Sequence, residues 1–298
     1  MMKHLYDRTY LTFRTLLRGI GQVIFQNNAL SGALMLVGIF INSYIMGIFA
    51  LLGTIISTLT AKLLKYDEGK INDGLYGFNG TLIGIAIPCF FAINVWSILL
   101  MIVASALSTW VAHNFAKQKL LPGLTGPFVV ITWIMLIMSI IFPVLRIVES
   151  VDPQISNNAF EPFKAFSLGF GQIMLQGNSL ITGLLFLLGI AVNVPKMSLR
   201  ATLACLLSLP LVWLPFIDTE LINNGLYGYN AILAFLAITD IVSISSFKYL
   251  KAFVALLLSF IIQYLGMHIG ITTLTAPFVL SVWIVVLIDK AGAKNNNI

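Results

Sequence analysis

The apolar residues of this chain fall in long runs that short polar stretches separate. A segment of about 20 apolar residues can cross a lipid bilayer as a helix, and most runs reach or approach that length. The first and fourth runs are long enough for two crossings each. The runs cover approximately residues 29–64, 82–113, 123–148, 178–217, 229–247, 252–268 and 273–289. This pattern predicts an integral membrane protein with about ten transmembrane helices.

Two polar regions interrupt the pattern. The stretch 149–162 is rich in acidic residues, asparagine and proline, which is typical of a linker. The first 19 residues mix basic side chains with leucine, tyrosine and phenylalanine, which predicts an interfacial amphipathic helix. We therefore expect an N-terminal interfacial helix at 1–19, a first membrane repeat at 20–148, a linker at 149–163, a second membrane repeat at 164–290 and a C-terminal tail at 291–298.

Three sequence blocks occur twice, in the same order and 150 or 151 residues apart. They pair Gly21–Val23 with Gly171–Ile173, Ile71–Asn79 with Ile222–Asn230, and Leu124–Val129 with Leu274–Val279. Trp133 likewise has a counterpart in Trp283. Chance does not produce three aligned blocks at one spacing, so the chain is a duplicated unit.

The duplication has a consequence for membrane topology. If each half crosses the membrane an odd number of times, the second copy lies in the opposite orientation. Folds of this kind place their solute path at the interface of the copies, lined by discontinuous helices. The blocks Gly21–Asn28 and Gly74–Gly84 are too polar and glycine-rich to face lipid. We expect an all-α membrane protein of two inverted five-helix repeats, with re-entrant half-helices lining a central pore.

Composition and charge agree with a membrane location. Hydrophobic residues make up 59% of the chain and charged residues 9%, against about 25% charged residues in soluble domains. The mean hydropathy is +0.97. The net charge of +6 does not indicate a nucleic-acid partner, because the basic residues lie at segment ends. Basic residues near both chain ends predict cytoplasmic termini, namely Lys3, Arg8, Arg14, Arg18, Lys290 and Lys294.

The polar residues of the apolar runs restrict the solute class. Acidic residues stand only at apparent segment ends, and no chain of acids and histidines crosses the membrane. Ion or proton coupling would need such groups, so neutral amides and hydroxyls point to a neutral polar solute. Aromatic side chains favour a flat one, since a ring face can cover a planar molecule. No nucleophile–base pair, metal-ligand cluster or phosphate loop indicates an enzyme or a cofactor. Cys89 and Cys205 are interpreted as packing residues.

The duplicated blocks resemble the paired signature of the urea transporter family. The resemblance rests on Gly-Leu-Tyr-Gly-Phe-Asn-Gly at 74–80, on its copy at 225–231 and on the Leu-Thr-Gly-Pro-Phe block with its copy. Gly-Gln-Val-Ile-Phe-Gln-Asn-Asn near the start is similar as well, so the likeness runs from about residue 15 to 288. It implies a channel-like homotrimer in which each subunit stacks urea between hydrophobic slots while a ladder of oxygens accepts its amide hydrogens.

The resemblance also implies which residues contact the solute. Gln22 and Gln172 correspond to polar residues at the filter mouths, and Thr125 and Thr275 to the threonines at the narrow middle. The implied substrate-binding residues are Gln22, Phe25, Phe78, Leu82, Thr125, Gln172, Ile173, Leu175, Tyr229, Leu233 and Thr275. Three depart from the family pattern: Gln172 replaces an acid of some members, Leu175 makes the slot with Phe25 only half aromatic, and Tyr229 needs a partner for its hydroxyl.

Simpler roles remain open for several of these residues. Gln22 and Gln172 could bridge segments, the two threonines could satisfy backbone groups freed by the following prolines, and Asn79 with Asn230 could tie a re-entrant turn together. For the whole protein we expect facilitated urea permeation through a bacterial inner membrane, with lipid and sister subunits as partners. The alternatives are a channel for ammonia, water or short amides, and an ion-coupled secondary transporter.

Overall fold

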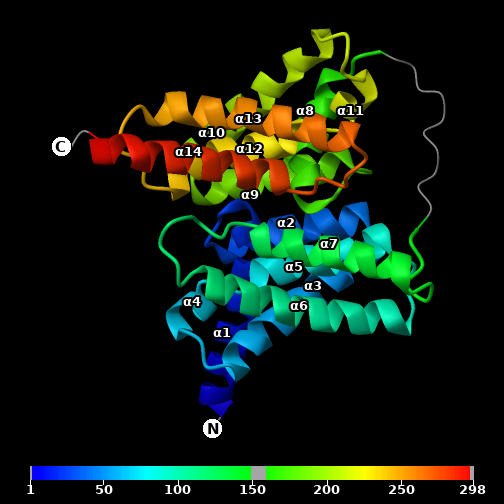
Figure 1. Ribbon diagram of the computed structural model, residues 1–298. Coiled ribbons are helices and arrows are strands. Elements are labelled where there is room, and N and C mark those ends of the chain that lie inside the picture. The colour runs from blue at the N-terminus through cyan, green and yellow to red at the C-terminus, as the bar shows by residue number, and fades with distance from the viewer. Residues whose placement is uncertain (1, 149–158, 296–298) are drawn as a thin grey trace.

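A computed structural model describes residues 2–148 and 159–295 of the chain, and helices dominate both parts. Figure 1 shows two blocks of helices, one from each half of the chain, stacked on each other. The ten residues at 149–158 lie outside the described residues, and so does most of the expected linker at 149–163. The final residues 296–298 of the expected tail lie outside them too.

The two halves contain matching sequences of helices. The first half comprises α1 (Met2–Gly21), the 3-10 turn η1 (Gln22–Ile24), α2 (Ala29–Asn42), α3 (Tyr44–Leu63), α4 (Glu68–Asn72), α5 (Gly77–Phe90), α6 (Val95–Phe115) and α7 (Gly126–Ile141). The second comprises α8 (Pro162–Gly171), η2 (Gln172–Met174), α9 (Leu180–Asn193), α10 (Pro195–Ser208), η3 (Leu209–Trp213), α11 (Thr219–Asn223), α12 (Gly228–Leu236), the π-helical turn η4 (Ala237–Ile241), α13 (Lys248–His268) and α14 (Ala276–Asn295).

The lengths of the helices vary widely. Within the described ranges, four helical segments are long and apolar enough to cross a membrane: Tyr44–Leu63, Val95–Phe115, Pro195–Trp213 and Lys248–His268. A bent pair, Thr12–Ile24 with Ala29–Asn42, adds a fifth if its two arms at 75° form one span. Four shorter apolar helices are α5, α7, α9 and α12 with η4. Such short helices need protein or water at their ends, because lipid cannot satisfy free backbone groups.

The first helix extends further into the protein than the expected boundary at residue 19. Leu17 and Ile20, near its end, are buried, and α1 packs against α2 and α5. The backbone of α2 comes close to it here, because a Cβ on Gly32 would lie 1.8 Å from the Leu17 carbonyl oxygen. The same contact recurs at Gly183 and Ser167 in the second half, at the same 1.8 Å.

Helices α3 and α5 pack with their backbones in direct contact. A Cβ added to Gly53 would lie 2.0 Å from the carbonyl oxygen of Gly80. One added to Gly84 would lie 2.0 Å from the carbonyl oxygen of Phe49. Glycine alone permits such an approach, since any side chain would force the helices apart. This packing fixes the half-helix α5 against a long helix.

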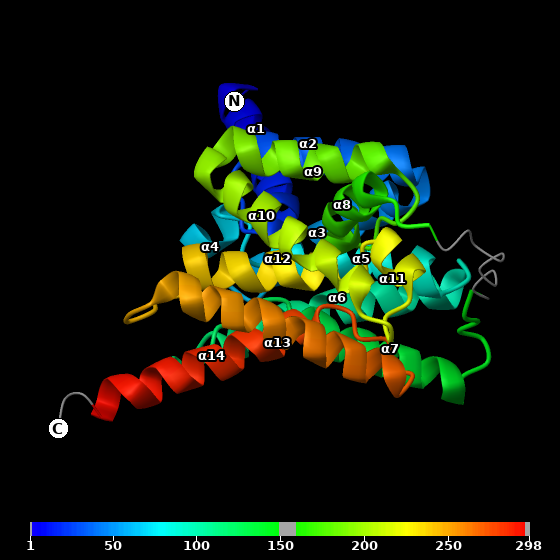
Figure 2. The same cartoon turned by 90° about the horizontal axis from the view of Figure 1, so that it is seen from above.

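The two halves meet along α2 and α9, which lie side by side in both views (Figures 1 and 2). The hydroxyl of Thr182 donates to the carbonyl oxygen of Gly38 at 2.7 Å, and Phe186 packs on the same glycine. Small residues and a hydroxyl are what membrane helices use to approach closely. The halves also touch through α7 with α14 and through η1 with η2.

Candidate functional site

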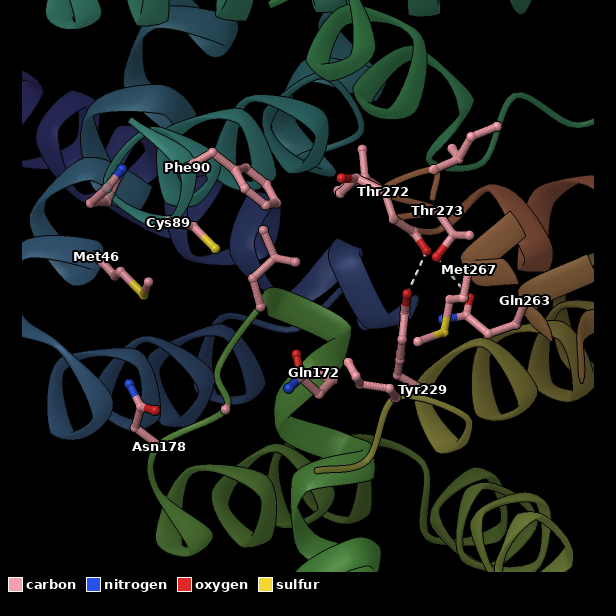
Figure 3. Close-up of a pocket in the computed structure, with 16 residues that line it drawn as sticks. Met46, Cys89, Phe90, Gln172, Asn178, Tyr229, Gln263, Met267, Thr272 and Thr273 are labelled. Atoms are coloured by element: carbon pink, nitrogen blue, oxygen red, sulfur yellow. Dashed lines mark hydrogen bonds between the residues drawn. The ribbon is translucent and has the colours of Figure 1, made fainter. Parts of the chain in front are cut away.

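Among the cavities formed by the described residues, two of about 490 Å³ each are lined by the duplicated blocks. We call them the first and second cavity after the half of the chain that supplies most of their walls. The first is lined by Gln22, Val23, Phe25, Asn27, Lys70, Leu75, Tyr76, Phe78, Ala112, Ala116, Pro122, Gly123, Leu124, Thr125, Pro127 and Ile241. The second, drawn in Figure 3, is lined by Met46, Pro88, Cys89, Phe90, Gln172, Leu175, Gly177, Asn178, Leu226, Tyr229, Gln263, Met267 and Ile271–Leu274.

Each half-helix reaches from one cavity to the other. Helix α5 has Phe78 on the wall of the first cavity and Cys89 on the wall of the second. The segment of α12 and η4 has Tyr229 at the second and Ile241 at the first. The two helices therefore run in opposite directions. Eleven helical residues span about 16 Å, which is shorter than the hydrocarbon core of about 30 Å.

The turns η1 and η2 position a matching pair of side chains. Phe25 and Leu175 cap these turns with φ of 59° and 58°, a left-handed conformation that reverses the chain. Phe25 lines the first cavity and Leu175 the second, so the two residues do not face each other across one slot. The neighbour that Phe25 meets instead is Phe278, with ring centroids 6.1 Å apart in an edge-to-face arrangement.

The two glutamines at the turns make equivalent hydrogen bonds. The Nε2 atom of Gln22 donates to the carbonyl oxygen of Asp73 at 2.9 Å. That of Gln172 donates to the carbonyl oxygen of Asn224 at 3.1 Å. These bonds bridge segments, as the simpler interpretation expects, and they fix each amide. One of the two hydrogens on each nitrogen is bound by the protein, and the Oε1 atom of each glutamine is an acceptor on its cavity wall.

The two halves touch at a pair of threonines. The hydroxyl oxygens of Thr125 and Thr275 are 2.7 Å apart, a hydrogen bond between residues 150 positions apart. Both side chains are buried. Thr125 is on the wall of the first cavity, and Leu274, next to Thr275, is on that of the second. The pair therefore stands between the cavities, and its hydroxyls are polar groups at that point.

Two asparagines and two tryptophans hold the threonine segments in place. The Oδ1 atoms of Asn79 and Asn230 accept from the backbone N–H groups of Phe128 and Phe278, at 3.1 and 3.2 Å. The tie expected of these asparagines is thus present in both halves. The indole of Trp133 donates to the carbonyl oxygen of Thr272, and that of Trp283 to the carbonyl oxygen of Pro122, each at 2.8 Å. The tryptophan of each half thereby binds the loop of the other.

Three sequence-predicted residues lie behind the cavity walls. Leu82, Ile173 and Leu233 are buried in the hydrophobic core and line neither cavity. Leu82 and Leu233 stand one helical turn after Phe78 and Tyr229, on the same helix face. Gln22, Phe25, Phe78 and Thr125 come together in the first cavity, while Gln172, Leu175 and Tyr229 come together in the second.

Tyr229 finds its hydrogen-bond partner within the protein. Its hydroxyl donates to the carbonyl oxygen of Leu274 at 2.5 Å, a bond drawn as a dashed line in Figure 3. Asn230 donates to the same carbonyl from Nδ2 at 3.2 Å. In the first half the corresponding Phe78 has no hydroxyl, and the Nδ2 atom of Asn79 is buried without a hydrogen-bond partner.

Acidic residues and histidines are absent from the described walls of both cavities, and the basic residues there are limited to Lys70. Arg200 pairs with Asp240, and Lys251 with Asp289, in two ion pairs of the second half. None of these four residues lines either cavity. Apart from Lys70, the cavity walls therefore offer amides, hydroxyls, carbonyl oxygens and apolar surface.

An aromatic cluster borders the first cavity. The rings of Tyr66 and His113 stack at 3.6 Å between centroids, and the hydroxyl of Tyr76 is hydrogen-bonded to Nδ1 of His113 at 3.1 Å. Tyr66 lies in the loop between α3 and α4, and burial raises the pKa of its phenol above the ordinary value. Tyr76 lies on the cavity wall, so this cluster supports the entrance without presenting charge to it.

Sequence reasoning missed several wall residues, among them Gln263 of α13. Gln263 stands inside an apolar helix, where an unpaired amide is costly, and this cost is the signal that could have identified it. Met46, Cys89 and Met267 have no comparable signal, since sulfur-containing residues are ordinary in apolar spans. Thr273 lies in a loop just before the Leu-Thr-Ala-Pro-Phe block, where any polar residue is unremarkable.

Comparisons with known proteins identify similar chains. A family model described as "Urea transporter" matches residues 13–290. Urea transporter 1 of Ovis aries is 30% identical over 95% of this chain and 77% of its own length. Urea transporter 1 of Rattus norvegicus is 33% identical over 75% of this chain and 62% of its own length. Urea transporter 1 of Mus musculus is 34% identical, with the same shares of the two chains.

Proposed function

This chain belongs to the urea transporter family, and from that premise we propose how its two cavities carry urea across a membrane. It is a multi-pass membrane protein for the facilitated permeation of urea and is not an enzyme. Urea is flat and neutral, with four N–H donors and one carbonyl acceptor. Each of these groups loses about 1–3 kcal/mol if it leaves water unpaired, so a route must supply hydrogen bonds along its length.

We propose that urea enters the first cavity, passes the two threonines and leaves through the second, or travels the reverse way. At the mouths, the free oxygens of Gln22 and Gln172 accept its amide hydrogens. Phe25 and Phe78 cover its faces in the first cavity, and Leu175 and Tyr229 in the second. The hydroxyls of Thr125 and Thr275 separate to take its hydrogens in the middle. The single observation that carries this route is the contact of the two threonines between two cavities of equal size.

The route agrees with an inverted arrangement of the two copies. We propose about ten spans in two five-span repeats, at 20–148 and 164–290, with the half-helices α5 and α12 at the core of the pore. Support comes from the opposite directions of the two half-helices: α5 begins at the first cavity and ends at the second, whereas α12 begins at the second and continues through η4 to the first. The basic chain ends favour two cytoplasmic termini. From the resemblance to the family we also propose a bacterial inner membrane location and a homotrimer with one pore in each subunit.

Transport follows the urea gradient in this proposal. The described cavity walls carry no acid or histidine through which a proton or sodium gradient could act. An ion-coupled transporter would need such a group in the solute path. A channel for ammonia or water would use the same cavities as a urea channel. Competition by urea analogues distinguishes the two functions.

The proposal predicts rapid urea exchange in proteoliposomes. Vesicles that contain the purified protein should shrink and re-swell in a urea gradient at least about tenfold faster than empty vesicles, measured by stopped-flow light scattering. Methylurea should compete, and an imposed proton or sodium gradient should leave the rate unchanged. A urea rate equal to that of empty vesicles would refute the proposal, and a rate that follows the ion gradient would indicate coupling.

A thiol reagent provides an independent test of the second cavity. Cys89 lines its wall and is partly exposed, whereas Cys205 is buried against Phe166 and Gly169. Mercuric ion bound at Cys89 would narrow the cavity, so it should reduce the urea rate several-fold, at least about threefold. The variant Cys89→Ser should keep its rate in the presence of the ion, and Cys205→Ser should remain sensitive. If mercuric ion slowed the wild type and Cys89→Ser equally, the result would contradict a urea route past Cys89 in the second cavity.

A further inference from the structure

We propose that Gln263 is a specificity-determining residue, which donates a hydrogen bond from Nε2 to the carbonyl oxygen of the solute in the second cavity. The residue at the corresponding position of the first cavity, Ala112, has no side-chain donor. The inference rests on the proposed function, because the solute it concerns is urea. The duplicated sequence alone would predict two equivalent cavities, and Gln263 makes them differ in how they recognise the solute.

The surroundings of Gln263 fix the orientation of its amide. Its Oε1 atom accepts from Nδ2 of Asn230 at 3.0 Å and from the hydroxyl of Thr273 at 2.9 Å. Asn230 is itself oriented, since its Oδ1 atom accepts from the backbone of Phe278. The oxygen of Gln263 is thus fully used on the protein side. Its nitrogen must point the other way, and Figure 3 shows it beside Tyr229 and Met267 at the cavity.

The nitrogen of Gln263 faces two groups of the protein, the thioether of Met267 and the hydroxyl of Tyr229, which already donates to Leu274. It contacts the sulfur of Met267 at 3.1 Å, and a thioether is a weak acceptor that can take one of its two hydrogens. Gln263 is only 2% exposed, so bulk water does not pair its other hydrogen, which has the Tyr229 hydroxyl and the cavity beside it. A buried donor of this kind loses about 1–3 kcal/mol when it is left unpaired. The carbonyl oxygen of a solute in the cavity supplies the acceptor.

The rest of the wall complements this donor. Gln172 lines the same cavity with its oxygen available, because its nitrogen is bound to Asn224. The cavity therefore offers an acceptor for amide hydrogens and, from Gln263, a donor for a carbonyl. A solute with both groups on one flat frame can satisfy both. A solute that lacks the carbonyl can satisfy only the acceptor.

The first cavity differs at the corresponding position. Buried residues of α6 and α13 correspond at a spacing of 151, which pairs Gln263 with Ala112. Ala112 lines the first cavity and has no donor. Asn79, the counterpart of Asn230, is left with a buried Nδ2 that has no hydrogen-bond partner. Because the first half has alanine in place of Gln263, Asn79 has no glutamine oxygen to which its Nδ2 could donate, whereas Asn230 donates to Gln263.

Comparison of urea with thiourea tests the donor directly. Thiourea has the same shape and N–H groups, but its sulfur is a weak acceptor in place of the carbonyl oxygen. In Gln263→Leu we expect the urea rate to fall about tenfold and the thiourea rate to change by less than about twofold. The ratio of the urea rate to the thiourea rate, measured in the same proteoliposomes, should therefore fall about tenfold.

A matched control separates this role from general packing. Gln26 is also a buried glutamine whose Nε2 atom contacts a methionine sulfur, that of Met197 at 3.2 Å. It lines neither cavity. Gln26→Leu should lose comparable hydrogen bonds and leave the urea-to-thiourea ratio unchanged. If Gln263→Leu does not fold, Gln263→Met keeps the length of the side chain and provides the same measurement.

Transfer of the donor to the other cavity is a converse test. Ala112→Gln should raise the urea-to-thiourea ratio above that of the wild type, because the free Nδ2 of Asn79 can orient the new amide as Asn230 does. A ratio that is unchanged in Gln263→Leu, or equal losses for both solutes, would overturn the inference while urea transport by the wild type stands. A wild type that does not conduct urea would overturn the proposed function and the inference with it.

Discussion

Thr125→Val and Thr275→Val are each expected to slow urea permeation about tenfold while the protein still folds. Valine has nearly the shape of threonine but lacks the hydroxyl. In either variant one oxygen of the 2.7 Å pair is lost, and urea passing this point leaves an N–H group without an acceptor. That loss of about 1–3 kcal/mol corresponds to a rate reduction between roughly fivefold and 150-fold. The double variant should be slower than either single one.

The chain contains a close control for this experiment. Thr54 and Thr81 form a second buried pair, whose hydroxyl oxygens are also 2.7 Å apart. Neither lines a cavity. Thr81→Val should therefore cost similar stability and leave the urea rate unchanged. Stopped-flow rates normalised to the amount of reconstituted protein provide the comparison. If both Thr125→Val and Thr275→Val conduct like the wild type, the threonine pair is not the narrow point of the route.

Gly53→Leu is expected to prevent correct folding. Even a single carbon on Gly53 would lie 2.0 Å from the Gly80 carbonyl oxygen, and backbone cannot move aside as a side chain can. We expect a loss of about 4 kcal/mol or more, which few single substitutions reach. The counterparts of Gly53 and Gly80, 151 residues later, are Ala204 and Ala231, so the second half does not repeat this glycine pair. The consequence for function is that α5 would no longer hold Phe78 and Asn79 at the first cavity.

Detergent-purified protein allows this prediction to be measured. Gly53→Leu should elute as an aggregate in size-exclusion chromatography or unfold at a much lower temperature than the wild type. Gly53→Ala should lie between the two. Gly292→Leu is the control, because a carbon added at Gly292 meets no atom within 4 Å, and it should behave like the wild type. A stable monodisperse Gly53→Leu protein would contradict the close packing of α3 on α5.

Many features of the site follow from the duplication in the sequence. The copied blocks predict that Gln22 and Gln172, and likewise Asn79 and Asn230, have equivalent places, and each pair makes equivalent hydrogen bonds. Identical local sequence gives identical local geometry because turns and caps depend on a few neighbouring residues. The same argument covers the left-handed residues Phe25 and Leu175, whose φ values differ by one degree.

The roles of Gln263, Tyr229 and Leu175 do not follow from the duplication. Gln263 belongs to none of the copied blocks, and its alignment with Ala112 becomes informative only when its nitrogen is seen beside a cavity. The hydroxyl of Tyr229 binds Leu274, which is 45 positions away. Leu175, expected opposite Phe25, lines the other cavity. These contacts depend on how distant segments pack together, which periodicity and spacing do not specify.

The sequence by itself determined the class of this protein and its duplicated plan. Apolar runs in a chain with few charges require lipid as the solvent, and three blocks at one spacing require two copies of one unit. The tertiary structure decided which side chains meet: Thr125 with Thr275, each tryptophan with the opposite loop, and Gln263 with the cavity of one half only. The physical reason is range. Solvent preference and turns are local properties of the chain, whereas a hydrogen bond across about 3 Å joins atoms that 150 residues of chain separate.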